Sequence, residues 1–233
     1  MPINLPNHRT LGLGVLLGCL PLGAPVTTLA DGFDAPRPFE ARYRLEIRGW
    51  PGATVRHTLS QESLHWTSDM RFSIAVAGGE ERSRFAVEDD QIRSLLYSSS
   101  YSLLGVGDRY QLGEDELSHL DRQAAIVDLS RRAGRESCTQ AAPCAIEFVD
   151  HRGRDEHFQY YDNDEVQRVS VPAGEFDTHS VILQDVDKPD RHLQIDFHPD
   201  WPGLILSAEY YKDGRRDTTL RLTQFDPSES ASP

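Results

Sequence analysis

The strongest constraint on the fold is a period-two alternation of apolar and polar residues. In residues 39–47, which read FEARYRLEI, the apolar side chains fall on every second position from Phe39 to Ile47. Successive side chains of a β-strand point to opposite faces of a sheet, so this segment predicts a strand with one buried face. A similar alternation over residues 66–76 predicts another such strand.

The spacing of these segments predicts the architecture. Turn signals such as WPGA at 50–53 recur about every eight to twelve residues, as they do in antiparallel sandwiches and barrels. We therefore expect a mainly β domain over residues 39–225, a single antiparallel β-barrel or half-barrel of meander strands with little helix. Its C-terminal half contains the expected strands 145–150, 157–161, 166–171, 192–198, 204–211 and 219–225.

The middle of the chain has a less regular pattern. Residues 92–104, 109–112 and 124–129 have the composition of strands, the last reading AAIVDL. Near 114–123 the pattern fits a helix as well as a strand, and both interpretations stay open there.

The first 30 residues predict export. An apolar run, LGLGVLLGCL at 11–20, follows Arg9 and is too short for a permanent membrane helix, which is typical of a signal peptide. Two outcomes stay open: cleavage after Ala30, or lipidation of Cys19, because LLGC at 16–19 also resembles a bacterial lipobox. We expect a periplasmic protein or an outer-membrane lipoprotein, attached to a membrane only through an acyl chain on Cys19.

Short segments flank the expected domain. Residues 31–38 are interpreted as a leader into the first strand. Residues 226–233 are rich in Ser and Pro and are expected to be disordered.

Two further cysteines, Cys138 and Cys144, lie close together around Pro143. In an oxidising compartment such a pair predicts a local disulfide. A redox pair or a metal pair is the alternative, but neither a C-x-x-C spacing nor a second pair is present.

Charge and motifs restrict the function classes. The formal net charge is −13 over 233 residues, which argues against a nucleic-acid partner because phosphate binding depends on clustered Lys and Arg. The motifs G-x-S-x-G, S-x-x-K and H-E-x-x-H do not occur. We therefore predict no catalytic residues and no cofactor.

Acidic and histidine side chains alternate on two expected neighbouring strands. If the strand register places His179 opposite Asp196 or His198, then Asp177, His179, Asp196 and His198 become candidate metal ligands. A shift of one residue separates them, since it moves every side chain to the other face. The sequence pattern does not decide the register, so we predict no metal and keep these four residues as the weaker alternative.

The segment Pro172-Ala173-Gly174 predicts a hairpin. Proline fits the first central position of a type I turn, and glycine adopts the left-handed conformation that completes a three-residue loop.

Several of these segments resemble the exported bacterial family known as domain of unknown function 3108. The resemblance rests on YRLEIRG at 43–49, VSVPAGEFDTHSV at 169–181, WPGL at 201–204 and LRLTQF at 220–225. It implies a β-rich, partly open barrel, similar in outline to the lipoprotein carriers of the cell envelope, and it transfers no catalytic residues. The family pattern also implies a short helix that begins with Asp-x-x-Ser, where this chain has the loop from Cys138 to Cys144.

These observations predict a non-enzymatic module of the cell envelope. A curved sheet of this size has a concave face, which aromatic side chains of the alternating strands would line or fill: Phe39, Tyr43, Trp66 and Phe72. We expect the partner to be an apolar ligand, a lipid or another envelope protein. Two alternatives stay open, an envelope hydrolase that acts on glycan or another polymer, and a scaffold or assembly factor without a ligand.

Overall fold

The structure, a computed structural model, describes residues 34–74 and 76–228. The predicted signal peptide, including Cys19 and Ala30, lies outside the described residues, as do residues 229–233 of the predicted tail. No helix among the described residues is long and apolar enough to cross a membrane.

Strands dominate the described chain, with 63% of the residues in strands and 7% in helices. The predicted mainly β fold class is therefore confirmed. The elements are β1 (Phe39–Ile47), β2 (Ala53–Glu62), β3 (His65–Ile74), β4 (Ala77–Glu88), β5 (Gln91–Leu103), β6 (Val106–Gly113), η1 (Glu114–Glu116), β7 (Leu120–Asp121), α1 (Arg122–Arg132), β8 (Cys144–Val149), β9 (Asp155–Asp162), β10 (Arg168–Val171), β11 (Gly174–Asp177), β12 (His179–Asp185), β13 (Arg191–Phe197), β14 (Ile205–Lys212) and β15 (Arg215–Pro227).

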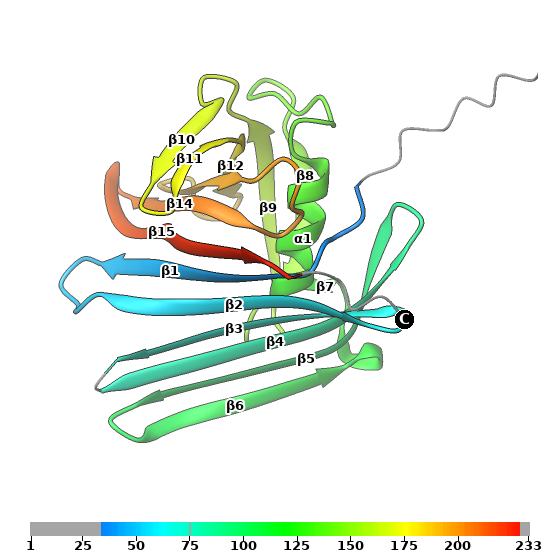
Figure 1. Ribbon diagram of the computed structural model, residues 1–233, viewed down its shortest axis with the longest axis vertical. Coiled ribbons are helices and arrows are strands. Elements are labelled where there is room, and N and C mark those ends of the chain that lie inside the picture. The colour runs from blue at the N-terminus through cyan, green and yellow to red at the C-terminus, as the bar shows by residue number, and fades with distance from the viewer. Residues whose placement is uncertain (1–33, 75, 229–233) are drawn as a thin grey trace, which may run out of the picture. The chain divides into compact units, whose positions relative to one another are not determined.

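One large sheet contains thirteen strands in the order β6-β5-β4-β3-β2-β1-β15-β14-β13-β12-β9-β8-β7 (Figure 1). Neighbouring strands are antiparallel, apart from the short parallel pair β7–β8. The sheet curves but does not close into a barrel, so the half-barrel form of the prediction is the one that the chain adopts. Strands β10 and β11 form a separate hairpin.

The period-two alternation produces the two faces of the sheet. In β1, Phe39, Ala41 and Tyr43 are buried, whereas the residues between them are exposed. Strands β2 and β1 pair in register, so that Val55 lies opposite Tyr43 on the same face. Burial of one face across consecutive strands fixes this register, because a slip of one residue would expose the whole apolar set.

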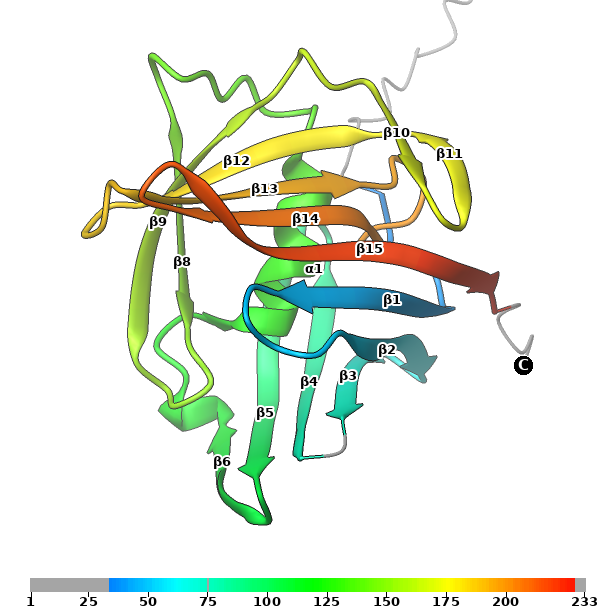
Figure 2. The same ribbon diagram turned by 90° about the vertical axis from the view of Figure 1, so that its left-hand side faces the viewer.

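Helix α1 lies inside the curve of the sheet (Figure 2). It packs on β4, β5, β7 and β8 and begins where the side chain of Asp121 accepts the backbone N–H groups of Gln123 and Ala124. The predicted strand at 124–129 is therefore wrong. A short apolar run fits a buried helix as well as a strand, and here the N-terminal cap decides for the helix. The chain thus has a helix before the Cys138 loop, although it lacks the Asp-x-x-Ser start.

The predicted disulfide is present. Cys138 and Cys144 are joined, with their Cα atoms 5.4 Å apart. The bond closes a short loop before β8 and pins that loop without crossing the sheet.

The hairpin at Pro172 is confirmed, with a different loop. Val171 pairs directly with Gly174, so the loop has two residues, Pro172 and Ala173, and not the three that were predicted. Gly174 has φ +142°, a region that side-chain-bearing residues rarely adopt.

Replacing Gly174 by Val tests this turn. The strained backbone should cost about 1 to 3 kcal/mol, which corresponds to a Tm lower by roughly 2 to 12 °C for a domain of this size. A matched control is Ser170→Val, an exposed position of the same hairpin where a β-branched residue suits the strand. Equal Tm values for the two variants would contradict the role of Gly174.

The last strand is longer than expected. Asp226 and Pro227 pair with Glu40 and Phe39, so β15 extends two residues into the segment that was predicted to be a disordered tail. The N–H of Ser228 also donates to the Pro38 carbonyl at 3.2 Å. The pairing with β1 orders these residues, whereas their composition alone suggests disorder.

Candidate functional site

A cavity of about 560 Å³ lies between α1 and the concave face of the sheet. Its walls are mainly apolar, and they come from α1 and from strands that are distant in sequence. The apolar lining consists of Leu45, Val55, Met70, Phe72, Ile126, Ile205 and Leu220. Its volume falls in the range of about 300 to 1,000 Å³ that is usual for small-molecule sites.

Strand register assembles the apolar wall. Leu45 of β1 lies opposite Leu220 of β15, and Val55 of β2 lies opposite Phe72 of β3. All four side chains point to the face that carries α1, because they share the alternation of the buried residues of their strands. The ring of Phe72 lies against Gly79, where an added Cβ would come within 2.3 Å of it.

Part of the polar lining is at the start of α1, and most of the rest comes from strands β3 to β5, with Arg71, Glu80 and Ser100 among its residues. The guanidinium of Arg122 forms an ion pair with Glu81 of β4, and the side-chain amide of Gln123 donates to the same carboxylate at 3.3 Å. These contacts fasten the first turn of the helix to the sheet and balance the charge of Glu81.

His151 lies beside this polar part. Its carbonyl accepts a hydrogen bond from the Ser99 hydroxyl at 2.6 Å. Burial, and then the positive charge of Arg122, hold the pKa of His151 below its usual value. The imidazole is therefore neutral at neutral pH and offers the cavity a polar group without a charge.

A buried chain of hydrogen bonds joins α1 to strands β2 and β3. Nε2 of His57 and the hydroxyl of Ser68 are 3.0 Å apart, and that hydroxyl donates to the side-chain oxygen of Gln123 at 2.9 Å. All three residues are buried. Burial lowers the pKa of His57 to about 3, so the ring stays neutral in the folded protein.

Asp121 is a second anchor, and it is fully buried. One carboxylate oxygen accepts the N–H groups of Gln123 and Ala124 at 3.0 and 3.1 Å. The other accepts the hydroxyls of Ser83 and Ser94 at 2.7 and 2.6 Å. Burial raises the pKa of Asp121 and these hydrogen bonds oppose the rise. The carboxylate therefore joins the helix start to β4 and β5.

The four weaker metal candidates do not come together. His179 pairs with Phe197, and Asp196 pairs with Ser180, so the register is not the one that would place His179 opposite Asp196 or His198. Asp177 belongs to β11 and forms an ion pair with Arg168 at 2.9 Å.

The structure also separates the residues that the sequence placed on one strand. Thr178 lies between the end of β11 and the start of β12, so Asp177 and His179 belong to different strands. The Thr178 hydroxyl donates to the Phe197 carbonyl at 2.9 Å. Within residues 34–74 and 76–228, one group has a metal-like clustering of ligand atoms, Glu136 with Cys138 and Cys144. Its two sulfur atoms are joined to each other and are not available as thiolate ligands.

The four aromatic side chains that were expected to line or fill the concave face divide between the two roles. Phe72 lines the cavity, whereas Phe39, Tyr43 and Trp66 are buried in the core. The sequence interpretation missed the helical part of the site, Arg122, Gln123 and Ile126, because it placed a strand there. An aspartate shortly before an apolar run is a known N-cap signal, and Asp121, three residues before Ala124, could have revealed the helix.

Comparisons with known proteins give a distant likeness. No family model and no curated protein matches the chain. Among solved structures it is similar to a chain in the complex structure of Pseudomonas aeruginosa MucA/MucB, with 12% identity over 84% of this chain and 53% of that chain and a TM-score of 0.40. A crystal structure of MucB gives 12% identity, 84% and 55% coverage and a TM-score of 0.35. This chain thus spans about half the length of those chains.

Proposed function

We propose that this protein is a non-enzymatic binding module of the cell envelope that holds an apolar or lipid ligand between α1 and the sheet. The observation that carries the proposal is the cavity of about 560 Å³ with apolar walls. A core that existed only for stability would fill this space with side chains, since protein interiors are close-packed.

The lining indicates a ligand with one polar end. Arg122 and His151 line the apolar cavity and also a neighbouring hollow, whose walls include Asp150, Arg154 and Lys188. An apolar chain would occupy the wall of Phe72 and its neighbours, and a polar group would lie near Arg122 and His151. Few polar groups in an otherwise apolar site orient a ligand and provide specificity.

The alternative of an envelope hydrolase finds less support in this cavity. Glycoside hydrolysis uses two carboxyl groups across a cleft, about 5 to 10 Å apart. The carboxylates that line this cavity, Glu80 and Glu81, are adjacent on β4 and point to opposite faces of the sheet. Glu81 is also held by Arg122 and Gln123.

The proposal includes export of the protein and its membership of the family known as domain of unknown function 3108. The apolar run before Cys19 supports secretion, by cleavage or by lipidation, and the disulfide between Cys138 and Cys144 suits an oxidising compartment. The resemblance to domain of unknown function 3108 supports the same assignment. Native mass spectrometry of protein purified from its own envelope would detect a retained lipid, and a spectrum of unliganded protein alone would favour the scaffold alternative.

A substitution that fills the cavity tests the site directly. Ile126→Trp adds a large side chain from α1 into the cavity, and we expect at least a tenfold weaker affinity for a fluorescent fatty acid titrated in solution. The matched control, Leu64→Trp, adds the same group at a turn residue that is 81% exposed and outside the cavity lining. The proposal fails if wild type shows no saturable binding, or if both variants bind as wild type does.

A further inference from the structure

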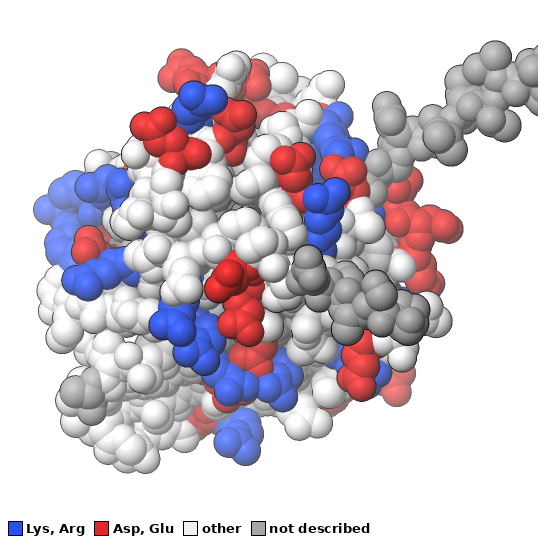
Figure 3. Space-filling view, viewed as in Figure 1, with Lys and Arg blue, Asp and Glu red and all other residues white. Residues whose placement is uncertain are grey.

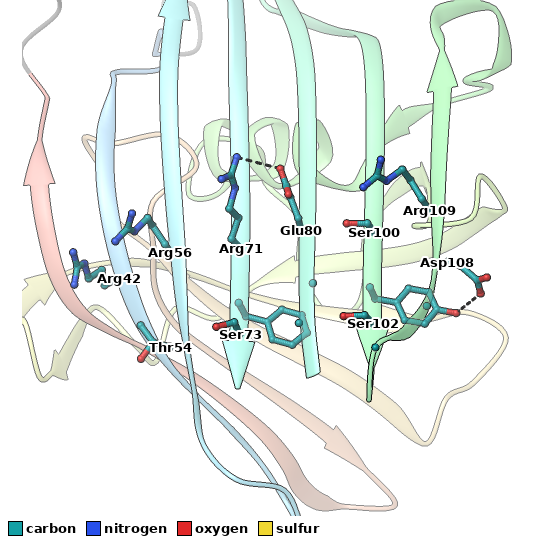
Figure 4. Close-up of a pocket in the computed structure, with 16 residues that line it drawn as sticks. Arg42, Thr54, Arg56, Arg71, Ser73, Glu80, Ser100, Ser102, Asp108 and Arg109 are labelled. Carbon is teal, nitrogen blue, oxygen red and sulfur yellow. Dashed lines mark hydrogen bonds and ion pairs between the residues drawn. The ribbon is translucent and has the colours of Figure 1, made fainter. Parts of the chain in front are cut away.

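Arginine side chains form a row on the outer face of the sheet, the face opposite α1. Arg42 of β1 pairs with Arg56 of β2, and Arg56 pairs with Arg71 of β3. Figure 4 shows the three side by side, with Arg109 of β6 beyond Glu80 and Ser100 in the same row. Like charges directly opposite each other on neighbouring strands destabilise a sheet, so this row costs stability unless an anion is bound there.

Carboxylates of the protein balance this row only in part. Arg71 forms ion pairs with Asp69 at 2.7 Å and with Glu80 at 3.1 Å. Within the part of the chain that the structure describes, the side chains of Arg42, Arg56 and Arg109 form no ion pair. They are exposed on a chain whose formal net charge is −13, where carboxylates are abundant.

The arginines border a hollow of about 750 Å³. Small side chains or glycines form much of its lining between the charged groups: Thr54, Ser73, Gly78, Ser100, Ser102 and Gly107. Two carboxylates, Glu80 and Asp108, belong to the same lining, and Asp108 accepts a hydrogen bond from Tyr101 at 2.8 Å. Four guanidinium groups and two carboxylates leave an excess of positive charge, and the hollow leaves room for anionic groups.

Apolar side chains lie at the adjacent end of the same strands. The hairpins β1–β2, β3–β4 and β5–β6 turn at one end of the sheet (Figure 1), and the amide of Leu104 donates to the Val76 carbonyl at 2.7 Å, which joins two of the turns. Trp50 is 53%, Leu104 76% and Val106 78% exposed. The corner of Figure 3 at the turns of β3 to β6 is free of charged side chains.

We propose that this end of the protein binds a lipid surface that carries anionic phosphate headgroups. Arg42, Arg56, Arg71 and Arg109 contact the phosphates, since guanidinium matches phosphate geometry with paired hydrogen bonds. The side chains of Trp50, Leu104 and Val106 enter the boundary between headgroups and acyl chains, where tryptophan is favoured. A soluble phosphate compound would use the arginines but would leave the exposed turns without a role.

The hollow and the cavity share lining residues where they adjoin, among them Arg71, Phe72 and Glu80. Lipid binding through the arginine row does not require a ligand in the cavity. The arginines and the cavity side chains alternate along the same strands, so that Arg71 and Phe72 point to opposite faces. The proposal also adds a membrane contact to the one expected through Cys19. Lipid binding here would hold the hairpin turns near the membrane. The concave face would lie on the side of the sheet opposite the arginines.

Sedimentation with lipid vesicles tests the proposal. The full chain is used with Cys19→Ser throughout, so that acylation is absent and the first 33 residues contribute equally to every protein. Vesicles contain phosphatidylcholine with or without phosphatidylglycerol. We expect binding that requires phosphatidylglycerol and falls with added salt, and that weakens at least about 25-fold in Arg42→Glu/Arg56→Glu, from about fivefold for each arginine lost.

The matched control is Arg93→Glu/Arg168→Glu, which makes the same change of net charge at exposed arginines outside the hollow. It should retain most of the vesicle affinity, whereas Trp50→Ser/Leu104→Asn should lose it with all four arginines in place. Near-ultraviolet circular dichroism checks that each variant is folded.

Equal loss in both arginine pairs, or wild-type binding to phosphatidylcholine alone, would refute the proposal. Binding of inositol hexakisphosphate without vesicle binding would refute the lipid assignment, and fatty-acid titration in solution reports separately on the cavity.

Discussion

Asp121→Ala should destabilise the described domain strongly. It removes the N-terminal cap of α1, which costs about 1 kcal/mol. It also leaves the buried hydroxyls of Ser83 and Ser94 without their acceptor, at about 1 to 3 kcal/mol each. The sum, about 3 to 7 kcal/mol, should lower Tm by roughly 6 to 28 °C in a calorimetric scan. Loss of the helix position should also abolish fatty-acid binding in the cavity.

Two controls separate this network from a general effect of losing an aspartate. Asp121→Asn keeps the shape and one capping oxygen, so we expect less than half of the loss in Tm. Asp115→Ala removes an exposed carboxylate a short distance earlier in the chain and should change Tm by no more than about 2 °C. If Asp121→Ala behaved like Asp115→Ala, the carboxylate would not be the junction between helix and sheet.

Acid should destabilise the protein through His57. In the unfolded chain this imidazole titrates near its ordinary pKa of about 6.5, whereas burial lowers it to about 3 in the folded state. Between these values the unfolded state binds a proton that the folded state excludes, so the free energy of unfolding falls as the pH falls. From pH 7 to pH 4 the loss from this residue should be about 3 kcal/mol. Urea unfolding at several pH values measures it.

His57→Gln isolates this contribution, because Gln does not titrate and can still form a hydrogen bond with Ser68. The variant should be less stable than wild type at pH 7 and lose less stability on going to pH 4. The difference between the two pH profiles removes the contributions of the other titrating groups, including Asp121, whose pKa is raised. Parallel profiles for the two proteins would show that His57 becomes protonated without unfolding.

The strands were predictable because burial of one face leaves a direct mark on the sequence. Phe39, Ala41 and Tyr43 alternate with charged residues, and the structure buries these three and exposes the others. Turn residues such as Pro172 and Gly174 have local conformational requirements, so the hairpin was also predictable. Helix α1 was not predicted, because its apolar run faces the concave sheet and has the composition of a buried strand, although Asp121 is a cap signal before it.

The site depended on information that a sequence pattern does not contain. The pairing of His179 with Phe197 is a matter of register, which both faces of β12 and β13 influence, and no local residue determines it. The cavity brings Leu45, Ile126 and Leu220 together from three distant parts of the chain. The arginine row was readable in principle, since Arg42, Arg56 and Arg71 occupy polar positions of strands that were predicted, but only the register places them opposite one another.

The order of the strands has a consequence for how the domain holds together. Almost every strand pairs with a neighbour in sequence, but β1 and β15, from opposite ends of the domain, pair in the middle of the sheet. One ladder, from Phe39 with Pro227 to Ile47 with Thr218, therefore joins an early and a late group of hairpins. Closing it spans nearly the whole domain and carries the largest loop-closure entropy of any pairing in the sheet. The two groups of hairpins cooperate through this central seam and through α1, which packs on β4 and β5 of the early group and on β8 of the late group.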